Sequence, residues 1–274
     1  KTIRKKFNEL WDDEKSIEAS EFTERWQERS HEVKRRVNYE KHWLLKYDRE
    51  LSPHDRELKN SEFELVRNVL QKKGLWGEIR NHLDVGTCTG RYLLGLREAV
   101  SQSEKGYSIG IDNDIDCVEL VESKIKDIPK AAFNRKIEAL KIDIIHDEYR
   151  LKSKNFDLIT CMMGTISHLG YDISEDYIQK ALDRMSNLLS ENGLLIISNW
   201  SDIALEKYKR YETPFLSIYN DHDNERLYDW TPNAVKLEEK LKKSDLEIVN
   251  VKQTRGGNLD IYFCQHQEKS NALS

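Results

Sequence analysis

The sequence predicts an α/β fold in which a mostly parallel β-sheet is covered by helices on both faces. Three observations predict it. Short apolar runs alternate with helical stretches between residues 82 and 200, which is the order typical of parallel strands joined by crossover helices. The first three runs each end close to an aspartate. Near the end of the chain, two strand-like runs are joined by Arg255-Gly256-Gly257, which is a hairpin signal.

The first part of the chain, residues 1–75, predicts a helical N-terminal lid. It is rich in Glu, Lys, Arg and aromatic residues, and its apolar residues recur mostly at helical spacing. Ser52-Pro53 is expected to break the helical pattern, because the residue before proline avoids the α region. A further helix is expected to begin at Ser61 and to end at Gly74, where glycine suits a C-terminal cap.

The expected core spans residues 76–200. Five short apolar runs predict buried strands, at residues 82–85, 107–111, 137–142, 156–162 and 194–198. Helices are expected after Gly90, over 116–127 and over 174–190, where apolar residues again recur at helical spacing. Little chain separates the third and fourth runs, so an irregular crossover is expected there.

The remaining chain predicts an insertion followed by elements that complete the core. Residues 201–233 contain many aromatic and polar residues without a strong period, which indicates a cap or substrate loop after the fifth strand. Residues 234–274 then supply a helix over 234–243 and two paired strands, 245–254 and 258–265.

Bulk composition restricts the class of protein. The chain has 274 residues, a net charge of −5 and 38% hydrophobic residues. This acidic balance argues against a general nucleic-acid binder. The four cysteines form no CxxC pair, which favours reduced thiols, and no zinc site is expected. The charged first residues do not resemble a signal peptide, and no apolar run approaches the ~20 residues of a membrane span. A cytoplasmic protein that does not enter membranes is therefore expected.

The most informative segment is His82-Leu-Asp-Val-Gly-Thr-Cys-Thr-Gly90, a strand followed by a glycine-bearing turn and a helix. The dinucleotide fingerprint G-x-G-x-x-G fails here, because Cys88 and Arg91 stand at two of its three glycine positions. Asp84, Gly86 and Gly90 instead match the pattern D/E-x-G-x-G-x-G. The segment resembles the first motif of class I S-adenosylmethionine-dependent methyltransferases. Cys88 replaces the middle glycine, so a differently shaped turn is expected there.

This resemblance implies a Rossmann-like, seven-stranded αβα sandwich that binds S-adenosylmethionine and releases S-adenosylhomocysteine. In the family, the acid at the end of the second strand, here Asp112, accepts hydrogen bonds from both ribose hydroxyls, since a carboxylate offers two acceptor oxygens. The resemblance places Asp143 near the adenine amino group and Ile144 against the ring. It thereby implies these cofactor-binding residues: Asp84, Gly86, Thr87, Gly90, Asp112, Asn113, Asp143, Ile144 and Met162.

The segment from Cys161 to Leu169 is similar to the corresponding stretch of small-molecule N-methyltransferases. Under that resemblance, His168 is a candidate base and Asp172 a candidate ligand for a cationic amine. A structural histidine and a solvated or helix-capping carboxylate are the alternatives. Met163-Gly164 stands where the glycine-type enzymes have Gly-Asn, so glycine itself is not expected as the substrate. Met162 and Met163 also occupy the region where metal-dependent relatives carry an acid, so no metal is expected.

Candidate substrate residues lie at both ends of the core. Trp26, Trp43 and Tyr47 are expected either to cover an ammonium substrate by cation–π contact or to pack a helix on the sheet. Trp200 and Asp202 follow the fifth strand, at the sheet edge where ligands bind.

Three functions remain open at this point. The first is N-methylation of an amine of a small molecule or a modified natural-product peptide, including its N-terminal α-amine. The second is methylation of RNA, for example a cap-type guanine, and the third is a non-catalytic methyltransferase-like binding protein. The sequence does not indicate an oligomeric state.

Overall fold

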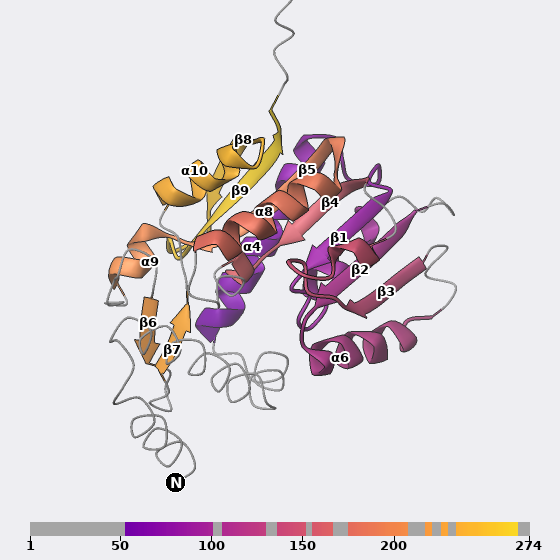
Figure 1. Ribbon diagram of the computed structural model, residues 1–274. Coiled ribbons are helices and arrows are strands. Elements are labelled where there is room, and N and C mark those ends of the chain that lie inside the picture. Colours follow the sequence, from indigo (N-terminus) through magenta and orange to yellow (C-terminus); the bar gives the residue numbers. More distant parts are fainter. Residues whose placement is uncertain are drawn as a thin grey trace, which may run out of the picture. The chain divides into compact units, whose positions relative to one another are not determined.

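The computed structural model describes residues 53–100, 106–129, 136–151, 155–166, 175–207, 217–220, 226–229 and 234–267. Their main feature is a seven-stranded sheet with the strand order β3-β2-β1-β4-β5-β9-β8 (Figure 1). This is the predicted α/β architecture of a Rossmann-like αβα sandwich.

Five strands of the sheet run parallel: β1 (Asn81–Val85), β2 (Tyr107–Asp112), β3 (Lys136–Lys141), β4 (Phe156–Cys161) and β5 (Leu189–Trp200). The chain moves outward from β1 to β3, then returns to the other side of β1 with β4. This reversal places the carboxyl ends of β1 and β4 next to each other at one edge of the sheet. Ligands bind at such a switch point in open α/β sheets.

The predicted C-terminal hairpin is confirmed and completes the sheet. β9 (Leu259–His266) lies antiparallel to both β5 and β8 (Leu246–Gln253). The paired residues Trp200 and Leu259 bring the start of β9 to the carboxyl edge of β5. A separate antiparallel ribbon consists of β6 (Ser217–Asn220) and β7 (Arg226–Asp229), within the predicted insertion. The same region begins with the short helix α9 (Asp202–Lys207).

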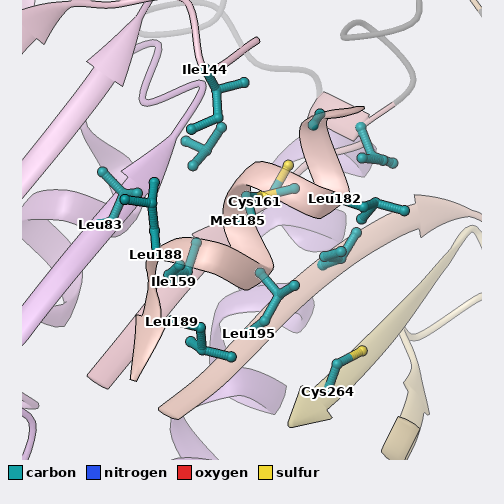
Figure 2. Close-up of a cluster of buried hydrophobic side chains, with 14 of the residues drawn as sticks. Leu83, Ile144, Ile159, Cys161, Leu182, Met185, Leu188, Leu189, Leu195 and Cys264 are labelled. Carbon is teal, nitrogen blue, oxygen red and sulfur yellow. The ribbon is translucent and has the colours of Figure 1, made fainter. Parts of the chain in front are cut away.

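Helices cover both faces of the sheet. One hydrophobic cluster joins α4 (Pro53–Lys72), α5 (Arg91–Gly95) and the short helix η1 (Leu96–Glu98) to β4, β5 and β9. The opposite cluster joins α8 (Glu175–Leu188) and α10 (Ala234–Lys243) to the other side of the same strands. Figure 2 shows the second cluster, in which Leu182 and Met185 of α8 lie among Ile159, Cys161 and Leu195 of the sheet.

α6 (Ile115–Lys126) packs on the edge of the sheet beside β3, through Val118, Val121 and Ala139. Its first turn is capped by Asp114, whose carboxylate accepts a hydrogen bond from the backbone amide of Asp116 at 2.9 Å. The connection between β3 and β4 holds only the short helix η3 (Glu148–Arg150) among its described residues, in agreement with the irregular crossover predicted there.

Two boundaries differ from the sequence prediction. α4 includes Pro53 and runs without a break through Ser61, so the prediction of a helix beginning at Ser61 was wrong; proline is tolerated in a first helical turn, where its missing amide proton is not needed. β5 begins at Leu189 rather than Leu194, because a bulge lets Leu189 pair with Phe156 ahead of the regular register.

The four cysteines are free thiols, as predicted, and three of them are buried. Over the ranges given above, no helix combines the length and apolar character needed to cross a membrane.

Candidate functional site

The turn after β1 is the centre of the candidate site. Gly86 has φ 68° and Gly90 has φ 77°, a left-handed backbone that favours glycine. The amides of Gly86 and Thr87 both donate to the carbonyl oxygen of Ile111 at 2.9 Å, which holds the turn against the end of β2. A Cβ atom at Gly86 would overlap the Cγ2 atom of Thr165. Glycine at this position therefore lets the Thr165 side chain pack directly against the turn.

Cys88 occupies the position of the missing middle glycine. Its φ is 46°, so the cysteine adopts the left-handed region that glycine favours. Its thiol lies against that of Cys117 in α6. The pKa of the Cys117 thiol is raised, mainly by its hydrogen bond to Cys88 and in addition by burial, so this thiol stays neutral.

Asp112 ends β2 beside this turn. Its Oδ2 atom accepts a hydrogen bond from the Cys88 amide at 2.9 Å, and its Oδ1 atom accepts one from the Asp114 amide at 3.0 Å. The Asn113 amide adds a third hydrogen bond to this carboxylate. A carboxylate offers about four lone-pair sites, so part of its acceptor capacity stays available. Burial raises the pKa of the Asp112 carboxyl group above its usual value. The neighbouring Asn113 is exposed.

Asp84, a residue of β1, holds the turn by hydrogen bonds. Its Oδ2 atom accepts hydrogen bonds from the Thr87 hydroxyl at 2.8 Å and from the Leu93 amide at 3.1 Å, while Oδ1 accepts one from the Thr160 hydroxyl at 2.7 Å. Burial raises the pKa of Asp84 to about 6, against the lowering effect of these bonds. The side chain is only 3% exposed, so Asp84 fixes the turn to β4 and α5 and presents little surface to a ligand.

The Thr160 hydroxyl also joins His82 to this network. Because its single proton goes to Asp84, the contact of 2.9 Å with His82 Nε2 is best satisfied when the histidine donates. Thr160 was missed by sequence reasoning. The sequence did contain a signal for Thr160: it is a threonine in an otherwise apolar strand, and a buried hydroxyl group needs a hydrogen-bond partner.

After β3, Asp143 is half-buried, and its Oδ1 atom accepts a hydrogen bond from the Ile145 amide at 2.9 Å. Ile144 is 2% exposed and belongs to the hydrophobic cluster under α8 (Figure 2). Its side chain therefore offers little area to an adenine ring, and Asp143 presents more of its surface.

The turn after β4 has two consecutive left-handed residues, Met163 with φ 56° and Gly164 with φ 70°. The Thr165 amide donates to the Met162 carbonyl oxygen at 3.1 Å and closes the turn. Positive φ at both central residues is the pattern of a type I′ turn, which is strained at a methionine. Met162 itself is buried in the cluster under α4.

The end of β5 lies against this turn. A Cβ atom at Gly164 would lie 2.8 Å from the indole Nε1 atom of Trp200, so the turn and the indole are in close contact. Asp202 is exposed, and its Oδ1 atom accepts a hydrogen bond from the Ala234 amide at 3.3 Å, at the start of α10. Sequence reasoning named both residues, and the structure places Trp200 at the turn that follows β4.

Two more segments, missed by sequence reasoning, reach the same edge. The Ser201 amide donates to the Asn258 carbonyl oxygen at 3.0 Å, and the Arg255 amide donates to the Ser61 hydroxyl at 2.9 Å. The turn of the C-terminal hairpin thus contacts both the end of β5 and helix α4. Glu62, next to Ser61, accepts a hydrogen bond from the Met163 amide at 3.0 Å. A signal for Glu62 was present, since it falls on the buried stripe Leu58, Val66 and Val69 at helical spacing.

The candidate catalytic residues His168 and Asp172 lie outside the described residues, as do the lid candidates Trp26, Trp43 and Tyr47. In the part of the chain that the structure does describe, no group of three or more His, Cys, Asp or Glu residues is arranged to hold a metal ion.

Comparison with known proteins agrees with this geometry. Residues 83–193 match the family described as "Methyltransferase domain". No curated protein matches the chain. A SAM-dependent methyltransferase from Aquifex aeolicus is 21% identical, with a TM-score of 0.55 over 82% of this chain and 98% of its own.

Two other solved structures show the same fold. Magnesium protoporphyrin IX methyltransferase from Synechocystis, solved with bound SAH, is 12% identical, with a TM-score of 0.60 over 88% of this chain and 99% of its own. N-methyltransferase NodS from Bradyrhizobium japonicum is 15% identical, with a TM-score of 0.51 over 76% of this chain and 98% of its own.

The matched family, the strand order and the turn after β1 together define the class. The chain contains a class I S-adenosylmethionine-dependent methyltransferase domain. Its residues fit that cofactor, because the Asp112 carboxylate keeps acceptor capacity at the end of β2, beside the left-handed turn that contains Gly86 and Gly90.

Proposed function

We propose that this methyltransferase transfers a methyl group to the nitrogen of an amine on a small molecule or a modified natural-product peptide. The N-terminal α-amine of a peptide is one such acceptor. The observation that carries the proposal is the contact between Trp200 and the turn after β4. An indole at this edge supplies the type of surface that attracts an ammonium group.

Three further observations support an amine acceptor. The sequence from Cys161 to Leu169 resembles small-molecule N-methyltransferases, and one of the structures with this fold is named an N-methyltransferase. The exposed carboxylate of Asp202 lies two residues beyond Trp200. The net charge of −5 favours a cationic partner over a polyanion such as RNA.

Under this proposal the edge has two sides. The cofactor side consists of the turn over residues 84–90, Asp112 and Asp143. The acceptor side consists of Ser61 and Glu62 of α4, the turn from Met162 to Thr165, Ser198 to Asp202, and the hairpin turn from Arg255 to Asn258. The cofactor, when bound, supplies an electrophilic methyl group on a positively charged sulfur.

The chain then has two tasks. Asp112 grips the ribose with its remaining lone pairs, while Gly86 lets the backbone approach the cofactor closely. The acceptor side orients the amine for in-line attack and excludes water. The amine must lose its proton before it attacks, and His168 and Asp172 stay candidates for that step. A cytoplasmic location and the lid role of residues 1–75 also stay predictions.

The test uses radiolabelled S-adenosylmethionine and a panel of acceptors. The panel contains small primary and secondary amines, peptides with a free or acetylated N-terminus, and capped RNA. We expect label in the amines or free-N-terminus peptides, and mass spectrometry of the product should place the methyl group on nitrogen. Asp112→Ala serves as the control without cofactor binding.

Two results would contradict the proposal. One is transfer only to oxygen or carbon acceptors. The other is transfer to capped RNA with an affinity that falls steeply with salt, which is the behaviour of a protein that contacts phosphates. Binding of S-adenosylhomocysteine without transfer to any member of the panel would favour a non-catalytic role.

A further inference from the structure

Helix α4 buries the carboxyl group of Glu62 beneath the acceptor side. Glu62 is fully buried, on the same helix face as Val66 and Val69. Its Oε1 atom accepts the hydrogen bond from the Met163 amide at 3.0 Å, across 101 residues of sequence. The other oxygen, Oε2, makes no hydrogen bond within the described part of the chain.

The surroundings of Glu62 are polar. The hydroxyl groups of Tyr92 and Ser198 face its carboxyl group, and the positive charge of Arg91 acts on it. The Arg91 guanidinium donates instead to the Lys59 carbonyl oxygen. Burial raises the pKa of the Glu62 carboxyl group, which favours the protonated form. Apolar residues would fill this position at lower cost, because burying a carboxyl group is unfavourable.

The benefit of a carboxyl group lies in the turn that it holds. Met163 and Gly164 are both left-handed, and the hydrogen bond that closes the turn uses the Thr165 amide and leaves theirs to other partners. Glu62 accepts from the first of these amides, and the Ser198 hydroxyl accepts from the second at 3.4 Å. A left-handed methionine persists only where its surroundings compensate the strain, and such strain is concentrated at functional sites.

We propose that Glu62 is a positioning residue for methyl transfer, which holds the strained turn Met163–Gly164 in the shape that aligns the acceptor. The proposal rests on the proposed function, since it assigns the acceptor side to this turn. Glu62 acts on the acceptor through the turn, and its hydrogen-bond partner Met163 and the facing hydroxyl groups of Tyr92 and Ser198 lie outside the cofactor side as defined above. Helix α4 thereby controls the alignment of the acceptor, although it lies outside the matched methyltransferase domain.

The test compares Glu62→Gln, Glu62→Ala and Glu62→Asp with Glu64→Gln. Glutamine keeps an acceptor oxygen for the Met163 amide, alanine removes it, and aspartate withdraws it by one methylene group. Glu64 lies on the exposed side of the same helix, with 58% of its side chain exposed, and serves as the control. The readouts are amide hydrogen exchange, S-adenosylhomocysteine affinity by calorimetry, and kcat and KM for an amine that the unaltered protein methylates.

In Glu62→Ala we expect exchange of the Met163 amide to accelerate about tenfold or more, the effect of losing one buried hydrogen bond. Exchange in β1 and β2 should stay unchanged. Affinity for S-adenosylhomocysteine should change less than about threefold, while kcat falls about tenfold or more. Glu62→Gln should keep the exchange rate and kcat close to those of the unaltered protein. Glu62→Asp should behave like Glu62→Ala, and it takes the place of Glu62→Ala in the test if that variant does not fold.

The proposal is overturned if the Met163 amide exchanges at its original rate in folded Glu62→Ala or Glu62→Asp, or if kcat is unchanged there. Faster exchange across the whole sheet, with kcat lost only in proportion to folded protein, also overturns it, because that is the result of a purely structural role. If no amine is methylated, the proposed function fails, while the exchange and affinity measurements still decide whether Glu62 holds the turn.

Discussion

The carboxylate of Asp112 accepts a hydrogen bond from the backbone amide of Cys88 at 2.9 Å. This contact joins the end of the second strand to the middle of the turn after the first. The residue expected to bind ribose therefore also holds the turn beside it, so a change at Asp112 is expected to alter the turn after β1 as well.

Substitution of Asp112 is expected to abolish most cofactor binding. Asp112→Ala removes acceptors for two ribose hydroxyls and leaves the Cys88 and Asp114 amides without partners. Charge-assisted hydrogen bonds contribute about 1.5–3 kcal/mol each, so the affinity for S-adenosylhomocysteine should fall at least a hundredfold. Calorimetry measures this directly. Asp116→Ala, an exposed carboxylate at the start of α6, is the matched control, and equal affinity in the two variants would contradict the assignment.

Gly86 is expected to tolerate no side chain. A Cβ atom at Gly86 would overlap Thr165, and the left-handed backbone there is itself costly for a residue with a side chain. Gly256 is also left-handed, with φ 85°, but a Cβ atom there would have no atom within 4 Å. Gly256→Ala should therefore cost only the conformational strain, about 1–2 kcal/mol of unfolding free energy. Gly86→Ala should cost more and should weaken S-adenosylhomocysteine binding.

The additional cost at Gly86 should be relieved by Thr165→Ser, which removes the overlapping Cγ2 atom. Chemical denaturation of the two single variants and the double variant measures the effect. If Thr165→Ser fails to restore any stability to Gly86→Ala, the overlap is not the cause of the loss.

Cys88 is expected to accept glycine more readily than a β-branched residue. The left-handed backbone at this position is costly for valine, so Cys88→Val should lose about 1–3 kcal/mol of unfolding free energy and should bind S-adenosylhomocysteine more weakly. Cys88→Gly should keep its affinity within about twofold, since the hydrogen bond to Asp112 comes from the backbone. Equal stability of Cys88→Val and Cys88→Gly would contradict this prediction, because it would show that the left-handed backbone at residue 88 has no cost for valine.

The stability of the protein should carry a pH dependence from Asp84. Its folded pKa of about 6 lies above the unfolded value of 3.8. The proton is bound more tightly in the folded state, so the stabilisation is complete below about pH 4 and is lost as the pH rises through about 6. From about pH 4.5 to about pH 7.5, the unfolding free energy of the protein relative to Asp84→Asn should fall by about 2 kcal/mol. Urea denaturation at the two pH values tests this, and a difference that stays constant or grows would refute it.

The cofactor side was accessible to sequence reasoning because its chemistry is local. Asp84, Gly86 and Gly90 lie within one short segment, and Asp112 ends a recognisable strand. The parallel sheet followed from the alternation of elements, and the antiparallel pair at its end followed from the hairpin signal. The left-handed backbone of Cys88 was not accessible in this way, because a positive φ at a non-glycine residue depends on contacts such as its hydrogen bond to Asp112 at the end of β2.

The acceptor side was much less accessible. Ser61, Gly164, Trp200 and Arg255 meet only after the chain has folded, and spacing alone does not bring them together. Sequence reasoning named Trp200 from its place after a strand, but it treated the helix that contains Ser61 only as part of an N-terminal lid. Glu62 was missed because one charged residue on a highly charged helix resembles its exposed neighbours.

This unequal distribution along the chain has an evolutionary consequence. The matched domain, residues 83–193, contains the proposed cofactor side and the turn from Met162 to Thr165, whereas the other segments of the proposed acceptor side, in α4, the end of β5 and the final hairpin, fall outside it. Donor use can thus be inherited unchanged while the recognition of acceptors diverges through substitutions in three separate regions. Engineering a new acceptor preference should begin with those regions and leave the donor loops intact.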